Sequence, residues 1–327
     1  MKQILLGGRV PASEISLGCM RISGLEPKAA ENLVRTALDE GINFFDHADI
    51  YGRGRSEEVF AQAVGMCPSV REKMLIQTKC AIHDGIYDFS KEHILRSVEG
   101  SLRRLKTDYV DFLLLHRPDT LMEPEEVAEA FDVLRRSGKV RHFGVSNQKS
   151  LQMELLNRAL DGEKLLIDQL QFSVCHTGMV DSGLNVNMKN SAAQDMDGSV
   201  LEYCRLNNVT IQPWSPFQYG FFEGVFIGSD RYPELNAVLD RIAEERGVTS
   251  SAVAIAWILR HPARMQPIVG TTNAARLKEI CAASRVELSR AEGISVLSDG
   301  SPDGPANLAW KAAEAFFAAA GITGGVS

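Results

Sequence analysis

Residues Tyr109–His116 read Tyr-Val-Asp-Phe-Leu-Leu-Leu-His, an almost unbroken apolar run of strand length. Such a run is typical of a strand buried on both faces, as in a parallel sheet that helices cover on its outer side. A helix-forming segment precedes the run at Ser90–Leu105 and another follows at Pro124–Ser137. The stretch therefore predicts a parallel sheet whose strands are joined by crossover helices.

The same alternation of short apolar runs and helical segments extends along the chain in both directions. The expected strands are Ile15–Cys19, Ile42–Asp46, Met74–Lys79, Tyr109–His116, His142–Val145, Leu166–Leu170, Thr210–Trp214 and Pro267–Val269. The expected helices are Lys28–Glu40, Ser56–Val64, Ser90–Leu105, Pro124–Ser137, Leu151–Leu160, Ser199–Asn207, Pro233–Arg246, Ser250–His261 and Ala274–Ala283. This order predicts an α/β fold of the (β/α)8 type, a TIM barrel, with an extra helix before the last strand.

The two ends of the chain differ from this pattern. Residues Lys2–Ile15, with Gly7 and Gly8 in the middle, predict an N-terminal β-hairpin that plugs the barrel floor. From Gly293 the texture changes to turn-forming residues and then to an Ala-rich stretch. We therefore expect a barrel domain over residues 1–292 and a divergent, mobile C-terminal tail over residues 293–327.

Composition excludes several classes of protein. The net charge is −7 and the pI is about 5.6, which argues against a nucleic-acid partner, because such surfaces are basic. The chain has no signal-peptide pattern and no apolar run long enough to span a membrane. Its 6 cysteines form no CxxC pair. We expect a cytoplasmic protein with reduced thiols and no membrane partner, and the pattern leaves its oligomeric state open.

Ionisable side chains follow the ends of three consecutive expected strands. Asp46 and Tyr51 follow the second strand, Lys79 the third and His116 the fourth. Because the carboxyl ends of neighbouring barrel strands surround one mouth, these side chains are expected to meet there. A carbonyl that accepts hydride needs a proton donor at its oxygen. We assign that role to Tyr51.

The other three side chains have supporting roles in this hypothesis. The ammonium of Lys79 favours the phenolate of Tyr51, and Asp46 holds Lys79 charged and oriented. A neutral His116 would hydrogen-bond the carbonyl oxygen and fix its angle. The four residue types together suit reversible reduction of an aldehyde or ketone to an alcohol.

Four short motifs carry a resemblance to a known family. Their residues are Gly-Ile-Asn-Phe-Phe-Asp-His-Ala-Asp-Ile-Tyr-Gly at 41–52, His-Arg-Pro-Asp at 116–119, Gly-Val-Ser-Asn at 144–147 and Asp-Gln at 168–169. In this order and spacing the chain resembles the aldo-keto reductases, in particular their bacterial YdhF-like branch. The resemblance implies the catalytic set Asp46, Tyr51, Lys79 and His116. One departure is His47, where Thr is common; it is either a packing variant or a second titrating group near the mouth.

The resemblance also implies NADPH/NADP+ as cofactor and a small carbonyl compound as substrate. No GxGxxG fingerprint opens a Rossmann half. In this family, Ser146, Asn147 and Gln169 would hold the nicotinamide carboxamide, and Trp214 would stack on its ring. Arg276, at a helix N-terminus, would read the 2′-phosphate, although Gly270 stands where many members have Lys. The full implied cofactor set is Gly18, Met20, Ser146, Asn147, Gln169, Trp214, Ser215, Phe217, Gly270, Thr271, Thr272, Arg276 and Glu279.

Alternatives remain open at this point. A cofactor-binding regulatory subunit, similar to the potassium-channel β subunits, would keep the barrel with little turnover; it is disfavoured because no extended inactivation segment precedes the hairpin. A metal-dependent hydrolase could use His83, Asp84, His47 and Asp49, but we expect no metal, because the histidines lack the spacing of a ligand set. Arg117 and Asp119 could form only a strand-end salt bridge. The aromatic residues after strands three and seven either line the substrate pocket or close their loops: Tyr87, Phe217, Tyr219, Phe221 and Phe222.

Overall fold

The computed structural model describes residues 1–293, so the expected tail lies outside the described residues apart from Gly293. Eight parallel strands form one curled sheet in the order β11-β10-β9-β8-β5-β4-β3-β12. They are β3 (Ser16–Gly18), β4 (Phe44–Asp46), β5 (Leu75–Cys80), β8 (Val110–Leu115), β9 (Val140–Ser146), β10 (Ile167–Gln169), β11 (Thr210–Ile211) and β12 (Ile268–Val269). The amides of Gln266 and Ile268 donate to the carbonyls of Ile211 and Pro213, at 3.0 and 2.9 Å. These bonds close the sheet into the expected (β/α)8 barrel.

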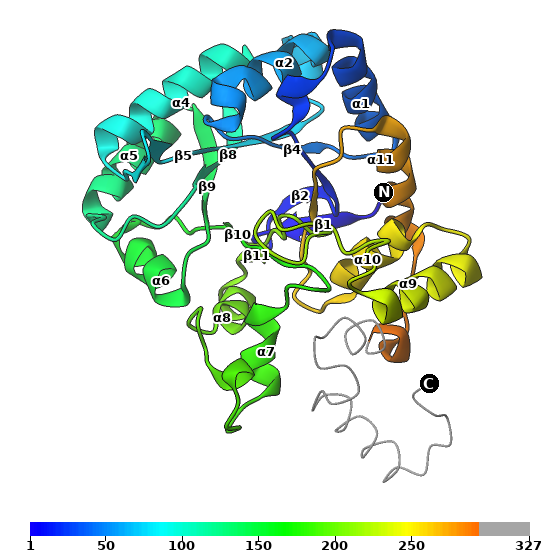
Figure 1. Ribbon diagram of the computed structural model, residues 1–327. Helices are drawn as coiled ribbons and strands as arrows, with labels where there is room; N and C mark the ends of the chain where they lie inside the picture. The colour runs from blue at the N-terminus through cyan, green and yellow to red at the C-terminus, as the bar shows by residue number, and fades with distance from the viewer. Residues whose placement is uncertain (294–327) are drawn as a thin grey trace.

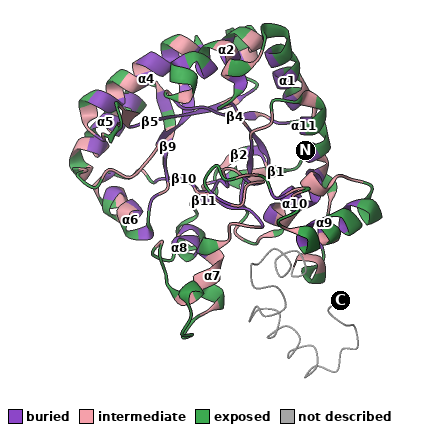
Figure 2. Ribbon diagram, viewed as in Figure 1, coloured by how far each residue is buried: buried purple, intermediate pink, exposed green. Residues whose placement is uncertain are grey.

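Helices surround the strands on the outside (Figure 1). They are α1 (Pro27–Asp39), α2 (Arg55–Val64), α4 (Lys91–Leu105), α5 (Pro124–Arg136), α6 (Ser150–Ala159), α8 (Val200–Asn207), α9 (Pro233–Arg246), α10 (Ser250–Arg260) and α11 (Ala274–Cys281). Their inner faces are buried and their outer faces exposed, as Figure 2 shows. In α4, for example, Ile94, Val98 and Leu105 face the core, as the apolar spacing of an amphipathic helix requires.

The N-terminal hairpin plugs one end of the barrel, as the sequence predicts. Strands β1 (Gln3–Leu6) and β2 (Val10–Ser13) pair antiparallel and lie across the middle of the ring in Figure 1. Leu6 packs with Phe44 and Phe112 in an apolar cluster inside the barrel. Gly7 has a positive φ, and a Cβ there would lie 2.6 Å from the Leu166 side chain. Glycine is required because the turn presses directly on the barrel floor.

Strand alternation divides side chains between the barrel interior and the helix layer. In β4, Phe44 points inward to Phe112, with ring centroids 5.6 Å apart. Phe45 points outward and packs on Phe60 of α2 at 5.1 Å. Asp46 then points inward again, because successive side chains of a strand alternate. The period therefore places Asp46 two positions above an apolar floor residue, at the carboxyl end of the strand.

Two short strands and two short helices were not expected from the sequence. Strands β6 (Ile82–His83) and β7 (Ile86–Tyr87) form a small hairpin in the loop after β5. Helix α7 (Gly178–Leu184) lies in the long connection after β10, and α3 (Pro68–Arg71) precedes β5. Among residues 1–293, no helix is long and apolar enough to cross a membrane.

Candidate active site

A buried lysine links the first three candidate residues. Lys79 is 0% exposed and Asp46 is 3% exposed. The Lys79 ammonium lies 2.8 Å from Asp46 Oδ1 and donates to the Tyr51 hydroxyl at 3.1 Å. Its third bond goes to the carbonyl of His47 at 2.8 Å. An ammonium buried in this way is tolerated because a carboxylate and two further acceptors replace water.

His116 completes the group from the neighbouring strand end. Its ring meets that of Tyr51 edge-on, with centroids 5.8 Å apart. Its Nδ1 is buried and makes no hydrogen bond within the described residues. Burial, and then the charges of Lys79 and Arg117, hold the pKa of His116 well below its ordinary value. The imidazole is therefore neutral at physiological pH, and its ring lies against that of Tyr51.

The protonation states of Tyr51 and Lys79 follow from burial and mutual charge. Burial lowers the pKa of Lys79, but the charges of Asp46 and Tyr51 outweigh it and the net direction is upward. Burial raises the pKa of Tyr51, and Lys79 offsets this only in part. Lys79 by itself lowers the pKa of Tyr51, as expected, and so favours the phenolate. The pKa is nevertheless raised overall, because burial removes water from the hydroxyl. Tyr51 is a protonated phenol at neutral pH.

A chain of buried glutamines supports Asp46 from below, and the sequence reasoning missed it. Gln77 donates to Asp46 Oδ1 at 2.6 Å and lies 2.8 Å from Gln212 Oε1. Gln212 donates to Gln266 at 2.7 Å. Gln266 donates to the carbonyl of Ser13, in the N-terminal hairpin, at 2.6 Å. Polar side chains thus connect the plug to the candidate site through the barrel interior.

His47 is a packing residue in this structure. It is 0% exposed, and its ring meets Phe60 edge-on at 4.5 Å. Burial, followed by the charge of Lys79, lowers its pKa to about 3. The alternative of a second titrating group near the mouth therefore does not hold at physiological pH.

The residues expected to hold the nicotinamide meet at the ends of β9, β10 and β11. The Trp214 indole donates to Asn147 Oδ1 at 3.2 Å, and Asn147 donates to Ser146 Oγ at 2.8 Å. Asn147 and Ser215 have φ values of +59° and +51°, a strained conformation that clusters at functional sites. Gln169 points into the barrel, where it donates to Asp46 Oδ1 at 3.1 Å.

The residues expected to bind the rest of the cofactor gather around β12 and the start of α11. Asn273 caps α11 by accepting from the amide of Arg276 at 3.1 Å. Arg276 is exposed, and no ion pair involves its guanidinium within residues 1–293. Thr272 and Glu279 are also exposed, and Thr271 Oγ1 accepts from the amide of Asn273.

Arg21 is a candidate that sequence reasoning missed. Its guanidinium donates to the carbonyl of Gly270 at 2.7 Å and so places a cation beside this residue. The neighbouring Gly18 ends β3, where a Cβ would come within 2.8 Å of Ile268. Met20 is partly exposed, and its carbonyl accepts from Ser56.

The aromatic residues after β11 divide between the two expected arrangements. Tyr219 closes its own loop, donating to the carbonyl of Glu223 at 2.7 Å. Phe221 meets Trp214 edge-on at 5.9 Å and is 57% exposed. Phe217 packs against the core, and Tyr87 is 51% exposed on the small hairpin after β5. Phe221 and Tyr87 therefore remain candidates for lining a pocket.

Arg117 and Asp119 do not pair with each other. Asp119 accepts from the amides of Phe89 and Leu121, at 3.0 and 2.8 Å. The Arg117 guanidinium lies 5.8 Å from the Trp214 ring centroid. Asp119 therefore fixes the local backbone, Arg117 lies near Trp214, and the strand-end salt bridge is not formed.

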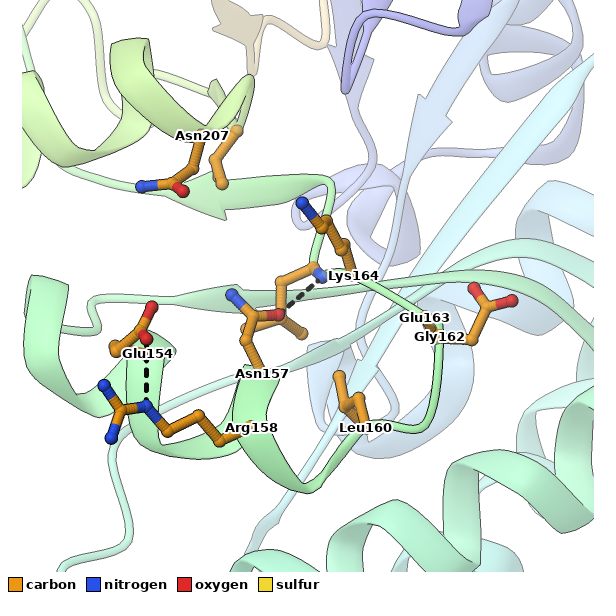
Figure 3. A pocket seen from close by; sticks show the side chains of 10 residues that line it. Glu154, Asn157, Arg158, Leu160, Gly162, Glu163, Lys164 and Asn207 are labelled. Carbon is orange, nitrogen blue, oxygen red and sulfur yellow. Dashed lines mark hydrogen bonds and ion pairs between the residues drawn. The ribbon is translucent and has the colours of Figure 1, made fainter.

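A cavity of about 400 Å³ lies away from these residues, between the ends of α6 and α8. Figure 3 shows Glu154 paired with Arg158 and Asn157 bonded to the backbone near Lys164 along its wall. None of the candidate catalytic or cofactor residues lines it. Its lining residues Leu165 and Val209 precede β10 and β11, so the cavity lies toward the amino ends of these strands and away from the mouth.

Comparison with known proteins agrees with the barrel fold. The sequence profile of the Aldo/keto reductase family matches residues 14–294, so this chain belongs to that family of oxidoreductases acting on carbonyl compounds. A 6-dehydroglucose reductase of Agrobacterium fabrum is 35% identical, and the alignment covers 89% of this chain and 95% of that protein. Oxidoreductase YdhF of Escherichia coli is 34% identical, with 79% and 83% covered. The resemblance to the YdhF-like branch is thereby confirmed.

A solved structure gives the same result for the fold. The thermostable aldo-keto reductase Tm1743, crystallised with the inhibitor epalrestat, matches with a TM-score of 0.71 and 27% sequence identity. The match covers 91% of this chain and all of that one.

Proposed function

We propose that this protein is an NADP(H)-dependent reductase of small aldehydes and ketones, in which Tyr51 is the proton donor. One observation carries the proposal. The Tyr51 hydroxyl accepts a hydrogen bond from the buried ammonium of Lys79, which forms an ion pair with Asp46. A phenol in this setting can release its proton to a developing alkoxide while the adjacent positive charge stabilises the phenolate left behind.

The other side chains position the carbonyl oxygen and exclude water. His116 is neutral, and in the appropriate tautomer its imidazole can donate a hydrogen bond to the oxygen. Asp46 keeps Lys79 charged, and Gln77 and Gln169 fix the orientation of its carboxylate. When bound, the nicotinamide supplies the hydride. The chain itself supplies the proton and the electrostatic environment in which the oxygen becomes charged.

The residues around the mouth fit a phosphorylated dinucleotide. Arg276 presents an exposed guanidinium at the capped N-terminus of α11, where helix amides and the dipole also favour an anion. Arg21 holds a second guanidinium beside Gly270. At the other end, Asn147, Ser146 and Trp214 form the polar and aromatic group proposed for the nicotinamide.

The cofactor assignment predicts a preference for NADPH over NADH of roughly ten- to hundredfold, or about 1.4–2.8 kcal/mol. Arg276→Met should weaken NADPH binding strongly and NADH binding little, because only NADPH has the 2′-phosphate. Dissociation constants of both cofactors, from quenching of protein fluorescence at fixed salt, measure the ratio. Lys278→Met, which removes an exposed cation two residues further along the same helix, is the matched control. Equal losses for both cofactors would mean that Arg276 packs on the adenine.

The substrate class is tested by NADPH oxidation with a panel of aldehydes, ketones, dicarbonyls, quinones and oxidised sugars. The sugars belong in the panel because one relative is named as a 6-dehydroglucose reductase. We expect saturable turnover with at least one carbonyl compound. A protein that binds NADPH yet reduces no member of the panel would instead support the regulatory-subunit alternative.

A further inference from the structure

We propose that His83, Asp88 and His93 form a binding site for a divalent transition metal such as Zn²⁺. One ligand atom from each residue lies within 4.8 Å of the other two. His83 belongs to β6 and His93 to the first turn of α4, with Asp88 in the segment between them. The cluster is separate from the group around Tyr51, and neither the reaction nor the cofactor proposal uses it.

His83 has one ring nitrogen available for a ligand. Its Nδ1 lies 3.4 Å from Asp84 Oδ2, and its Nε2 lies 2.9 Å from Asp88 Oδ2. If Nδ1 carries the proton and donates to Asp84, the lone pair of Nε2 faces the Asp88 carboxylate. Two electron-rich atoms at this distance need a positive centre between them, which is either a proton on Nε2 or a metal ion that displaces that proton. A metal ion bound to both would meet that need, with Asp84 fixing the imidazole from behind, as partners of metal-bound histidines commonly do.

Asp88 and His93 also each have one polar atom in a hydrogen bond and a second atom that could bind the ion. Asp88 Oδ1 accepts from the amide of Ser90 at 2.8 Å, which leaves Oδ2 for the ion. His93 Nε2 lies 3.3 Å from Ser97 Oγ. His93 is 4% exposed, and its Nδ1 is buried with no hydrogen-bond partner among the described residues. Each of the three side chains thus has one polar atom held by a second partner and another available for the cluster.

The donor set defines the class of ion. Two imidazoles and one carboxylate suit Zn²⁺ and its neighbours among the divalent transition metals, whereas Ca²⁺ and Mg²⁺ prefer oxygen ligands only. Bond lengths of about 2.0–2.2 Å require ligand atoms closer together than 4.8 Å, the limit within which these atoms lie. Small rotamer changes achieve this, because the His83 and Asp88 side chains are 31% and 26% exposed. The exposed side would leave the fourth tetrahedral position to water.

Such an ion would fix the small β6–β7 hairpin to the start of α4. His83 is only four residues beyond Lys79, and Tyr87 lies at the end of the same hairpin. The hairpin follows β5 at the carboxyl end of the strand. Metal binding would therefore stiffen a loop beside the mouth while the ion itself stays outside the group around Tyr51. From the sequence, His83 was considered with other residues and no metal was expected, because His83, Asp88 and His93 are spaced five residues apart and do not lie on one helix face.

The test measures Zn²⁺ directly, with no cofactor and no turnover, so its failure leaves the proposed function untouched. The full chain carries Cys67→Ser throughout, because this exposed thiol could bind the metal by itself. After dialysis against a chelator, Zn²⁺ is titrated by calorimetry and counted by native mass spectrometry. We expect one saturable Zn²⁺ per chain and, at a hundredfold excess over the dissociation constant, a rise in Tm of about 5 °C.

Variants locate the ion. His83 lies near the surface, so the His83→Ala variant should fold. It should weaken Zn²⁺ binding at least tenfold, and Asp88→Asn should have the same effect. His93→Ala removes a buried ligand and serves only if its circular dichroism matches the parent. His176→Ala, a half-buried histidine on the loop after β10, is the matched control and should bind normally. A parent without saturable binding, or a His83→Ala variant within twofold of the parent, would overturn the proposal.

Discussion

The two ends of the barrel interior are built by the same strands but have opposite chemistry. At the hairpin end, Phe44 and Phe112 pack with Leu6 in a sealed apolar cluster. One strand repeat higher, Asp46 and Gln77 lie in a buried polar network. Burying polar groups costs free energy that only good hydrogen bonding offsets. The floor therefore contributes stability, whereas the mouth places charged groups in a dry setting, where we propose that they act on a substrate.

Tyr51→Phe should separate the two ends most clearly. The phenol is the proposed proton donor, so carbonyl reduction should fall roughly 10²–10⁴-fold. The ring and its contact with His116 remain, so Tm and NADPH affinity should change little. Stopped-flow measurement of hydride transfer, with cofactor binding measured in parallel, checks this. Retention of more than about a tenth of the wild-type turnover would remove Tyr51 from the acid role.

Phe112→Ala should produce the opposite result. The side chain is fully buried in the floor cluster, so its removal should cost about 3–5 kcal/mol of unfolding free energy. The kcat of the molecules that stay folded should remain within about twofold of wild type. Urea unfolding and active-site titration measure the two quantities. A large fall in kcat at unchanged stability would show that floor and mouth are not separable.

His47→Thr tests a polar residue that lies outside the barrel interior. In the unfolded chain its pKa is about 6.5, and in the folded protein it is about 3. Below about pH 6.5 only the unfolded state takes up this proton, so stability falls as pH falls, by about 1.4 kcal/mol per unit. Between pH 7 and pH 5 the wild type should lose about 2 kcal/mol more than the variant.

Urea unfolding at both pH values measures that difference. The pH profile of kcat should be the same in the two proteins, because His47 does not titrate in the active range. Parallel pH dependence of stability in the two proteins would show that His47 is not held neutral by burial.

Gln77→Leu should give the smallest change. It tests whether the buried polar network contributes to catalysis as well as to stability. Asp46 Oδ1 and Gln212 Oε1 each keep a bond from Gln169, so no acceptor is orphaned and stability should fall by about 1 kcal/mol. Asp46 loses one of its fixed donors, and kcat should fall roughly tenfold through misplacement of Lys79. Gln77→Glu, which keeps the shape but sets two carboxylates together, should lower kcat further and raise the pH at which activity appears. A Leu variant with normal kcat would make the network purely structural.

The sequence was sufficient for the architecture because it depends on local periodicity. The run at Tyr109–His116 and the helices beside it showed a parallel sheet, and strand ends showed which side chains share a mouth. The network of Gln77, Gln212 and Gln266 could not be predicted in this way. Strand alternation says which residues face inward, but not which layers of neighbouring strands meet after the sheet closes.

Loop geometry was equally hard to predict. The bond from Arg21 to Gly270 joins two loops 249 residues apart, and no periodicity relates them. The cluster of His83, Asp88 and His93 depends on a two-stranded turn whose pairing is set by tertiary contacts. His47 was read both as packing and as a titrating group, and only its burial against Phe60 decides between them.

Closure of the barrel imposes an order on how the protein is made. During synthesis Asp46, Tyr51 and Lys79 are made early, whereas Gln266 and β12 are made only after about four-fifths of the 327 residues. The bond from Gln266 to Ser13 spans 253 residues, and β12 pairs with β3 across a similar distance. Until that late segment emerges, water enters the unfinished cylinder and solvates the glutamines. A nascent chain therefore carries every reactive group for many seconds of synthesis before it encloses the dry interior that gives them their chemistry.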